Sequence, residues 1–298
     1  LMLIGILTTI FSTEPKIKRV KLINNNYHLK FFIVFILAII GFIFLYQVIN
    51  NPFDEKQILI KFLFASFRIL LCFILAGTIV STFILAGFIS MKDTSNLYIK
   101  PITNFTQKYG KFAVAILLLI GLYRIADVVM GVMANVFYLE KGFDINEIAT
   151  YSKFFGVFAT ILGGFLGGFF ALRFGTMKAL FLGALIAAAS NLLFAWLAVA
   201  PISIKFLIIV ITADNISSGF AGAAFVVYLS GLTSVKFTAT QYALFSSIML
   251  FLPKLIAGYS GSWVDIMGYA NFFTLTAILG IPVLLMIVWI SKVAPIKN

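Results

Sequence analysis

Residues 206–231 read FLIIVITADNISSGFAGAAFVVYLSG, an apolar stretch that is long enough to cross a lipid bilayer. It nevertheless contains Asp214 and Asn215 about one third of the way along. An ionised group at the centre of a membrane helix costs at least about 2.5–3.5 kcal/mol, so such groups usually face a bundle interior or a water-filled path. The stretch therefore predicts a membrane helix with a functional polar position inside it.

The composition of the whole chain agrees with this prediction. Of the 298 residues, 62% are hydrophobic and 11% are charged, and the mean hydropathy is +1.10. These values predict an all-α membrane protein, folded as a polytopic helical bundle. The formal net charge is +12, but the basic residues gather in short loops between apolar runs, which argues against nucleic acid as a partner. The single cysteine, Cys72, provides neither a disulfide framework nor a metal site.

Eight membrane-spanning helices are expected, and they divide the chain into five parts. The expected spans are about 31–50, 62–91, 113–139, 148–172, 179–200, 206–231, 239–263 and 270–291. The apolar run at residues 1–11 is interpreted as the end of a preceding helix. The parts are residues 1–30 (helix end and basic cytoplasmic loop), 31–91 (two-helix insertion), 92–112 (polar cytoplasmic linker), 113–291 (six-helix unit) and 292–298 (cytoplasmic tail).

The orientation follows from the distribution of lysine and arginine. Fourteen of them lie in the loops on one side of the expected spans, and four lie in the loops on the other side. Loops rich in basic residues stay in the cytoplasm, so the C-terminus of this multi-pass protein is expected to be cytoplasmic. The basic loops could also hold anionic lipid headgroups, but we interpret their charge as a consequence of topology.

Charged residues inside the expected spans are candidates for a substrate or proton path. Arg124 and Asp127 are three residues apart and share a helix face, which predicts an ion pair, either static or switchable. Asp214 is a candidate proton carrier, with a structural ion pair as the alternative. Lys254 follows Pro253 and could bind an anionic substrate, bind the Asp214 carboxylate, or extend its amine to the interface.

Two segments that contain glycine allow a structural prediction each. The segment GGFLGG at 163–168 contains two overlapping pairs of small residues with a spacing of four, which predicts close packing against another helix. The segment LRFGTMK at 172–178 forms a short basic turn between two spans. Arg173, Gly175 and Lys178 could latch one conformation of a transporter, or they could anchor the turn on the cytoplasmic side.

Several blocks resemble the AmpG-like muropeptide permeases of the major facilitator superfamily. They are LYRIAD at 122–127, DNISSG at 214–219, FTATQYALFSS at 237–247, GSWVD at 261–265 and GYANFF at 268–273. The resemblance implies two six-helix halves that rock about a central site, and this chain would form the C-terminal half. It also implies proton-coupled symport of anhydro-muropeptides into the cytoplasm. The residues assigned to the substrate or proton path are Arg124, Asp127, Asp214, Asn215, Gln241 and Lys254.

The resemblance leaves the N-terminal half of such a permease to a longer chain or to a partner chain. A permease of the same fold for another solute, such as an acyl-CoA, is one alternative, and a truncated, non-transporting membrane scaffold is another. An enzyme is not expected, because the single histidine, His28, lies in a basic loop. The expected partners are the lipid bilayer, an anhydro-muropeptide-like solute and protons, with no cofactor, metal or nucleic acid.

Overall fold

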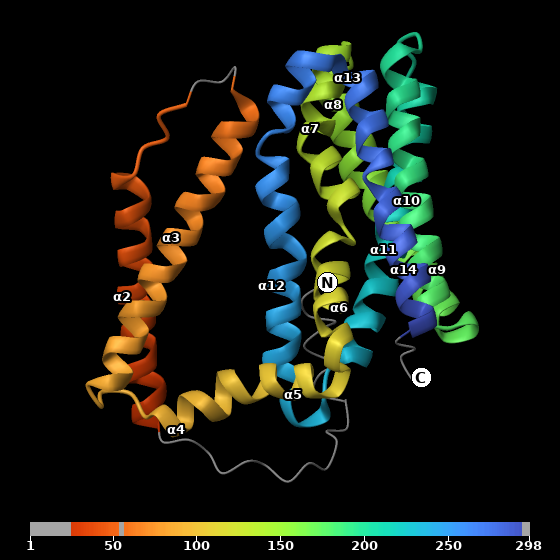
Figure 1. The fold of residues 1–298 in the computed structure, drawn as a ribbon. Coiled ribbons are helices and arrows are strands. Elements are labelled where there is room, and N and C mark those ends of the chain that lie inside the picture. The colour runs from red at the N-terminus through yellow and green to blue at the C-terminus, as the bar shows by residue number, and fades with distance from the viewer. Residues whose placement is uncertain (1–24, 54–56, 294–298) are drawn as a thin grey trace. The chain divides into compact units, whose positions relative to one another are not determined.

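The described chain consists of helices. A computed structural model describes residues 25–53 and 57–293, and within these ranges it contains no strand (Figure 1). Eight segments of this part are long and apolar enough to cross a membrane, which confirms the predicted number of spans and the all-α class. The expectations for residues 1–24, including the apolar opening run and most of the first basic loop, and for residues 294–298 lie outside the described residues.

The described residues fall into two compact units. The first lies within residues 1–49 and 70–94, and the second within 50–69 and 95–298. The first unit contains α2 (Asn25–Val48), most of α3 (Ile58–Leu85) and α4 (Met91–Thr94). Its helices are joined by ring contact between Phe42 and Phe73, whose centroids are 5.2 Å apart, and by a 3.0 Å hydrogen bond between the Tyr27 and Thr94 hydroxyls. The predicted domain boundaries stay a prediction.

The second unit is a helical bundle with an aromatic and aliphatic core. Its helices are η1 (Ser95–Ile99), α5 (Lys100–Tyr109), η2 (Gly110–Phe112), α6 (Ala113–Leu122), α7 (Ile125–Lys141), α8 (Ile145–Ala149), η3 (Thr150–Phe155), α9 (Gly156–Phe174), α10 (Thr176–Val199), α11 (Ile204–Leu232), η4 (Val235–Phe237), α12 (Thr238–Ala257), α13 (Ser260–Ile278) and α14 (Gly280–Val293). Phe137, Phe194 and Phe273 are fully or almost fully buried, and their ring centroids lie 5.0–6.5 Å apart. These contacts join α7, α10 and α13.

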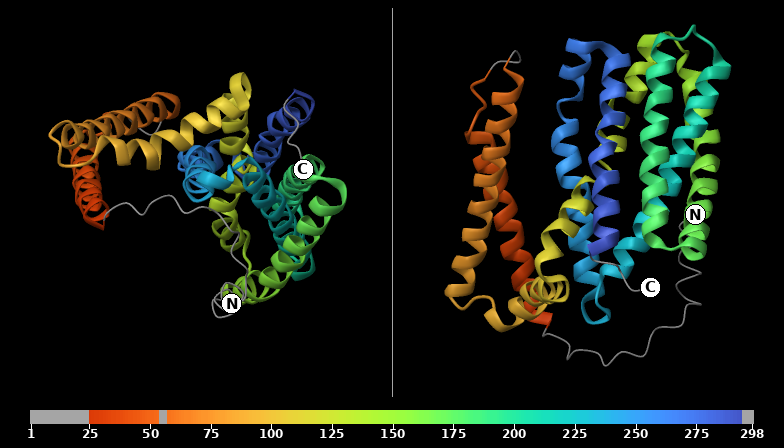
Figure 2. Two further views of the ribbon diagram at one scale, coloured as in Figure 1. Left: turned by 90° about the horizontal axis from the view of Figure 1, so that it is seen from below. Right: turned by 45° about the vertical axis from the view of Figure 1, so that its right-hand side comes forward.

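The ends of the helices in the second unit follow the expected alternation of loops. In Figure 2, the α9–α10 turn, the α11–α12 turn and the last turn of α14 lie at one end of the unit, as α5 does. The α10–α11 turn and the α12–α13 junction lie at the opposite end. Among the described loops of the second unit, those predicted to be richer in lysine and arginine therefore share one end. The assignment of this end to the cytoplasm stays a prediction.

Residues 92–112 differ from the expected polar linker, because they are helical. Within the second unit, α5 runs across the ends of α6 and α12 (Figure 1). It buries Pro101 and Phe105 against the bundle and leaves Lys100 and Lys108 exposed. Pro101 stands in the first turn, where its fixed φ angle suits the start of a helix. The polar composition of the segment predicted a linker, but the segment contains an amphipathic helix.

Three expected spans are also interrupted. The span expected at 113–139 breaks between α6 and α7, and the span expected at 239–263 ends at Ala257, after which α13 begins at Ser260. The span expected at 270–291 breaks between α13, which ends at Ile278, and α14, which begins at Gly280. Gly268 has a φ of 75° and kinks α13. A residue with a side chain rarely adopts this φ, so glycine permits the kink.

Candidate functional site

The break between α6 and α7 positions the candidate site. Tyr123 lies at the break, and its hydroxyl donates hydrogen bonds to Leu180 O of α10 at 3.2 Å and to Ala221 O of α11 at 3.4 Å. Its ring stacks on Phe225 with a centroid distance of 4.5 Å and an interplanar angle of 5°. Because Tyr123 is held by two neighbouring helices, the position of the next residue, Arg124, is fixed as well.

Arg124 forms the predicted ion pair with Asp127. The pair connects Nη2 of Arg124 to Oδ2 of Asp127, and the two side chains are 24% and 16% exposed. The same Nη2 donates a 3.2 Å hydrogen bond to Ser218 Oγ on α11. Gly222 lies one turn further along α11, and a Cβ atom there would be 3.7 Å from Arg124 Nη1. The guanidinium thus lies along a face of α11 that small residues keep open.

Asp214 belongs to this same face of α11, one turn before Ser218. Ser190 Oγ of α10 donates to Asp214 Oδ1 at 3.5 Å, the outer limit of a hydrogen bond, and Ser217 Oγ donates to Ser190 Oγ at 3.1 Å. Polar groups from α7, α10 and α11 therefore meet inside the bundle. We call Arg124, Asp127, Ser190, Asp214, Ser217 and Ser218 the interior cluster.

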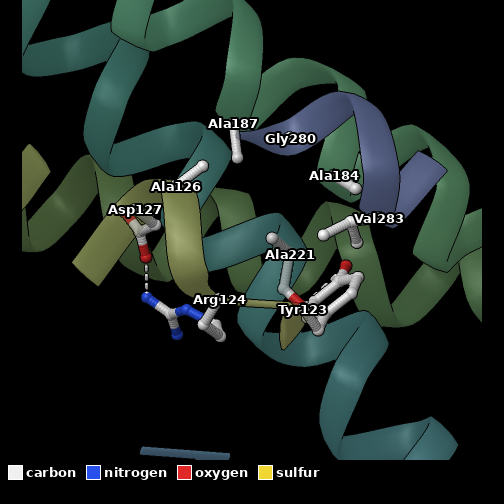
Figure 3. Close-up of a pocket in the computed structure, with 9 residues that line it drawn as sticks. All are labelled: Tyr123, Arg124, Ala126, Asp127, Ala184, Ala187, Ala221, Gly280 and Val283. Atoms are coloured by element: carbon white, nitrogen blue, oxygen red, sulfur yellow. Dashed lines mark hydrogen bonds and ion pairs between the residues drawn. The ribbon is translucent and has the colours of Figure 1, made fainter. Parts of the chain in front are cut away.

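A small pocket adjoins the ion pair (Figure 3). Arg124 and Asp127 line one side of it, and the ring of Tyr123 lies on another. The remaining lining residues are Ala126, Ala184, Ala187, Ala221, Gly280 and Val283. Most of these residues are alanine or glycine, whose side chains are a methyl group or a hydrogen atom. Their small side chains leave the space next to the ion pair.

Hydrogen-bonding capacity is left unused in the interior cluster and at Asn191, which follows Ser190 on α10. Among the described residues, Arg124 Nε and Asn191 Oδ1 are buried and have no hydrogen-bond partner. Asn191 is 1% exposed, and its Nδ2 donates to Ala126 O at 3.3 Å. An unsatisfied buried polar group costs about 1–3 kcal/mol, so a bound ligand or water could recover this free energy. The sequence analysis missed Ser190 and Asn191, although a polar pair in the middle of the span expected at 179–200 was a visible signal.

Asn215 lies beside the interior cluster but contacts a different helix. Its Oδ1 accepts a 3.0 Å hydrogen bond from Thr160 Oγ1 of α9, and its Nδ2 donates to Ile211 O at 2.8 Å. A Cβ atom on Gly156 would be 3.1 Å from Asn215 Nδ2. The Asn215 amide therefore packs against α9 at Gly156, where a side chain would leave little room for it. Asp214 and Asn215 are neighbours in sequence that serve two faces of α11.

Gln241 and Lys254 lie on α12, whereas Asp214 lies on α11. Gln241 is fully buried, its Nε2 donates to Pro101 O at 2.8 Å, and its Oε1 accepts from Ser234 N at 2.7 Å. It thus clamps α5 to the α11–α12 turn. Lys254 is exposed, and within residues 25–53 and 57–293 the structure records no contact between its amine and the Asp214 carboxylate.

The glycine segment at 163–168 packs against α11. Side chains at Gly163 or Gly167 would collide with the backbone carbonyls of Ile216 or Phe220, and one at Gly219 would collide with Thr160 O. These contacts confirm the predicted close packing, which joins α9 to α11.

In the α9–α10 turn, Arg173 and Lys178 are exposed and Gly175 has a φ of 94°. The described residues contain no group of three His, Cys, Asp or Glu that could hold a metal ion.

The fold defines a multi-pass, all-α membrane protein whose bundle contains the charged and polar interior cluster. No protein-family model matches the chain. The chain is 29% identical over 268 residues, 90% of its length, to "Putative transporter AmpG 4" of Rickettsia conorii, of which it covers 58%. It is 34% identical to "Putative transporter AmpG 4" of Rickettsia felis and 36% identical to "Putative transporter AmpG 1" of Rickettsia bellii. Each of these two matches covers 65% of the chain and 46% of the relative.

These similarities confirm the predicted resemblance to AmpG-like transporters. The chain spans about half the length of the curated relatives it matches.

Proposed function

We propose that this chain forms the C-terminal half of a proton-coupled transporter that imports muropeptide-like cell-wall turnover products into the cytoplasm across the inner membrane. The N-terminal half would come from the same longer chain or from a partner chain. In this proposal the protein moves a solute and catalyses no chemical conversion, and the relatives named as transporters support that part.

The observation that carries the proposal is the partly buried Arg124–Asp127 pair at a helix break, with Asp214 nearby on α11. Muropeptides carry carboxylates, and a guanidinium can bind a carboxylate through two parallel hydrogen bonds. The solute carboxylate would replace Asp127 as the partner of Arg124. A proton on Asp127 or Asp214 would compensate the negative charge that remains inside the membrane.

The other predicted path residues have different places in this proposal. Lys254 is exposed on α12, where its amine is accessible to a solute outside the described bundle. Asn215 and Gln241 would support the path indirectly, by holding α9 and α5 against α11 and α12. Arg173, Gly175 and Lys178 would act in the α9–α10 turn, when the two halves rock about the site.

Uptake into vesicles tests the proposal. The assembled transporter, reconstituted under an inward proton gradient, should accumulate anhydro-muropeptide and lose this accumulation when the gradient is collapsed. Asp214→Asn should abolish the response to the gradient while solute exchange without a gradient persists. A working reconstitution that shows no uptake would refute the substrate, and gradient-driven uptake by Asp214→Asn would refute the role of that carboxylate.

A permease for another anionic solute is the second candidate. The pocket beside the ion pair is small and is lined mainly by alanine and glycine, so nothing in it selects a sugar over another group. A panel that contains an acyl-CoA and a free peptide, measured in the same vesicles, separates the two candidates. A non-transporting scaffold would tolerate simultaneous neutralisation of Arg124, Asp127 and Asp214 without loss of its role.

A further inference from the structure

The proposed function uses the amphipathic helix α5 only as a support that Gln241 holds, and it assigns no role to the lysines of this helix. It runs across the ends of α6 and α12 in Figure 1, whereas the bundle helices run along the unit. Its buried side carries Pro101 and Phe105, and the Phe105 ring packs on Phe245 of α12 with a centroid distance of 5.0 Å. An amphipathic helix that lies across the ends of membrane-spanning helices is suited to the membrane–water interface.

Hydrogen bonds hold α5 against the α11–α12 turn. Lys108 Nζ donates to Leu232 O at 3.2 Å, and Tyr109 OH donates to the same carbonyl at 3.4 Å. Ser234 Oγ donates to Asn104 Oδ1 at 2.6 Å. These bonds hold α5, which carries Lys100 and Lys108, against the turn that carries Lys236, so both segments contribute lysines to the surface at this end of the second unit.

This surface is positively charged without compensation from nearby sequence. We call Lys100, Lys108, Lys111 and Lys236 the basal lysines, and all four are exposed. Residues 95–112 and 233–241 contain no aspartate or glutamate. The amines of Lys108, Lys111 and Lys236 lie 5.0, 5.2 and 5.5 Å from the ring centroids of their neighbours Tyr109, Phe112 and Phe237. Each of these amines thus lies beside an aromatic ring, at the edge of an apolar surface.

Exposed apolar side chains stand next to two of the basal lysines, Lys100 and Lys236, in the sequence. Ile99 is 42% exposed, Ile102 is 47% exposed and Val235 is 71% exposed. Apolar side chains of this kind insert into the boundary between headgroups and acyl chains, while lysines at the same depth bind phosphates. A soluble anion would use the lysines but would leave these apolar side chains in water.

We propose that the basal lysines form a binding site for the phosphate of an anionic phospholipid headgroup. The bound lipid would hold α5 in the interface and, through the bonds to Leu232 and Asn104, would steady the α11–α12 turn. The proposal does not depend on which solute the transporter moves.

Native mass spectrometry of the delipidated, purified full chain in detergent tests the site. Dioleoyl phosphatidylglycerol should bind more tightly than dioleoyl phosphatidylcholine. Each basal lysine near an anionic surface is worth about a fivefold change in affinity, so Lys111→Gln combined with Lys236→Gln should weaken phosphatidylglycerol binding about 25-fold. Neither residue donates to the α11–α12 clamp, so this variant should remain folded.

The matched control is Lys153→Gln combined with Lys205→Gln, which removes two exposed lysines from η3 and from the first turn of α11. This control should bind phosphatidylglycerol as the unaltered chain does. Equal affinity for the two lipids, or an equal loss in the control, would overturn the proposal. Displacement of the lipid by an equal concentration of glycerol 3-phosphate would assign the site to soluble phosphates and would overturn the lipid assignment.

Discussion

Helix α11 has two faces that illustrate opposite uses of small residues. On the face toward α9, Gly219 accepts a backbone approach so close that no side chain would fit. On the face toward α7, Ser218 and Gly222 leave room for the Arg124 guanidinium, part of which has no hydrogen-bond partner. The first face is filled by backbone atoms and joins two helices into one body. The second face retains space and polar capacity, which is what a binding site requires.

The largest effect is expected from filling the closed face. Gly167→Val would place a side chain against Phe220 O, and because a backbone carbonyl in a helix has little freedom to move, the cost should reach about 3 kcal/mol. We expect a strongly lowered thermal midpoint in detergent or a failure to accumulate. Gly168→Val is the matched control, because nothing lies within 4 Å of a Cβ atom there, and it should change stability by less than about 1 kcal/mol. Equal effects of the two variants would contradict the close backbone contact between Gly167 of α9 and Phe220 of α11.

The open face should show its effect on transport. Arg124→Ala removes the guanidinium that pairs with Asp127 and would bind the solute carboxylate; one charge-assisted contact is worth about 1.5–3 kcal/mol, so uptake should fall about 10- to 100-fold. The double variant Arg124→Ala with Asp127→Asn should recover part of the thermal stability, since position 127 no longer carries an unpaired charge, but it should not recover uptake. Normal uptake by either variant would remove Arg124 from the path.

A smaller effect is expected at Gln241, which is polar and buried as the interior cluster is, yet is fully satisfied. Gln241→Met leaves Ser234 N and Pro101 O without their partner, which should lower the free energy of unfolding by about 2 kcal/mol. Gln107→Met is the control, because Gln107 is exposed on α5 and should tolerate the change. An unchanged thermal midpoint for Gln241→Met would show that the clamp is dispensable.

The smallest effect is expected at Lys254. Its amine is exposed, so Lys254→Gln should change stability by less than about 0.5 kcal/mol. If the amine contributes a long-range attraction to an anionic solute, uptake should fall by about threefold, and the loss should diminish at high salt. Lys205→Gln serves as the control, and a salt-independent loss of uptake would point to a direct, desolvated contact instead.

The sequence by itself determined the class of the protein, the number of membrane spans, the Arg124–Asp127 pair and the presence of a closely packed glycine pair within 163–168, which the structure assigns to Gly163 and Gly167. These features follow from local spacing and composition, because residues three or four positions apart on one helix are neighbours in any fold. Only the tertiary structure decided which helix each face meets. It separated Asp214 from Asn215, brought Ser190 to the interior cluster, and turned α5 across the end of the bundle, because contacts between distant segments depend on packing that no local pattern encodes.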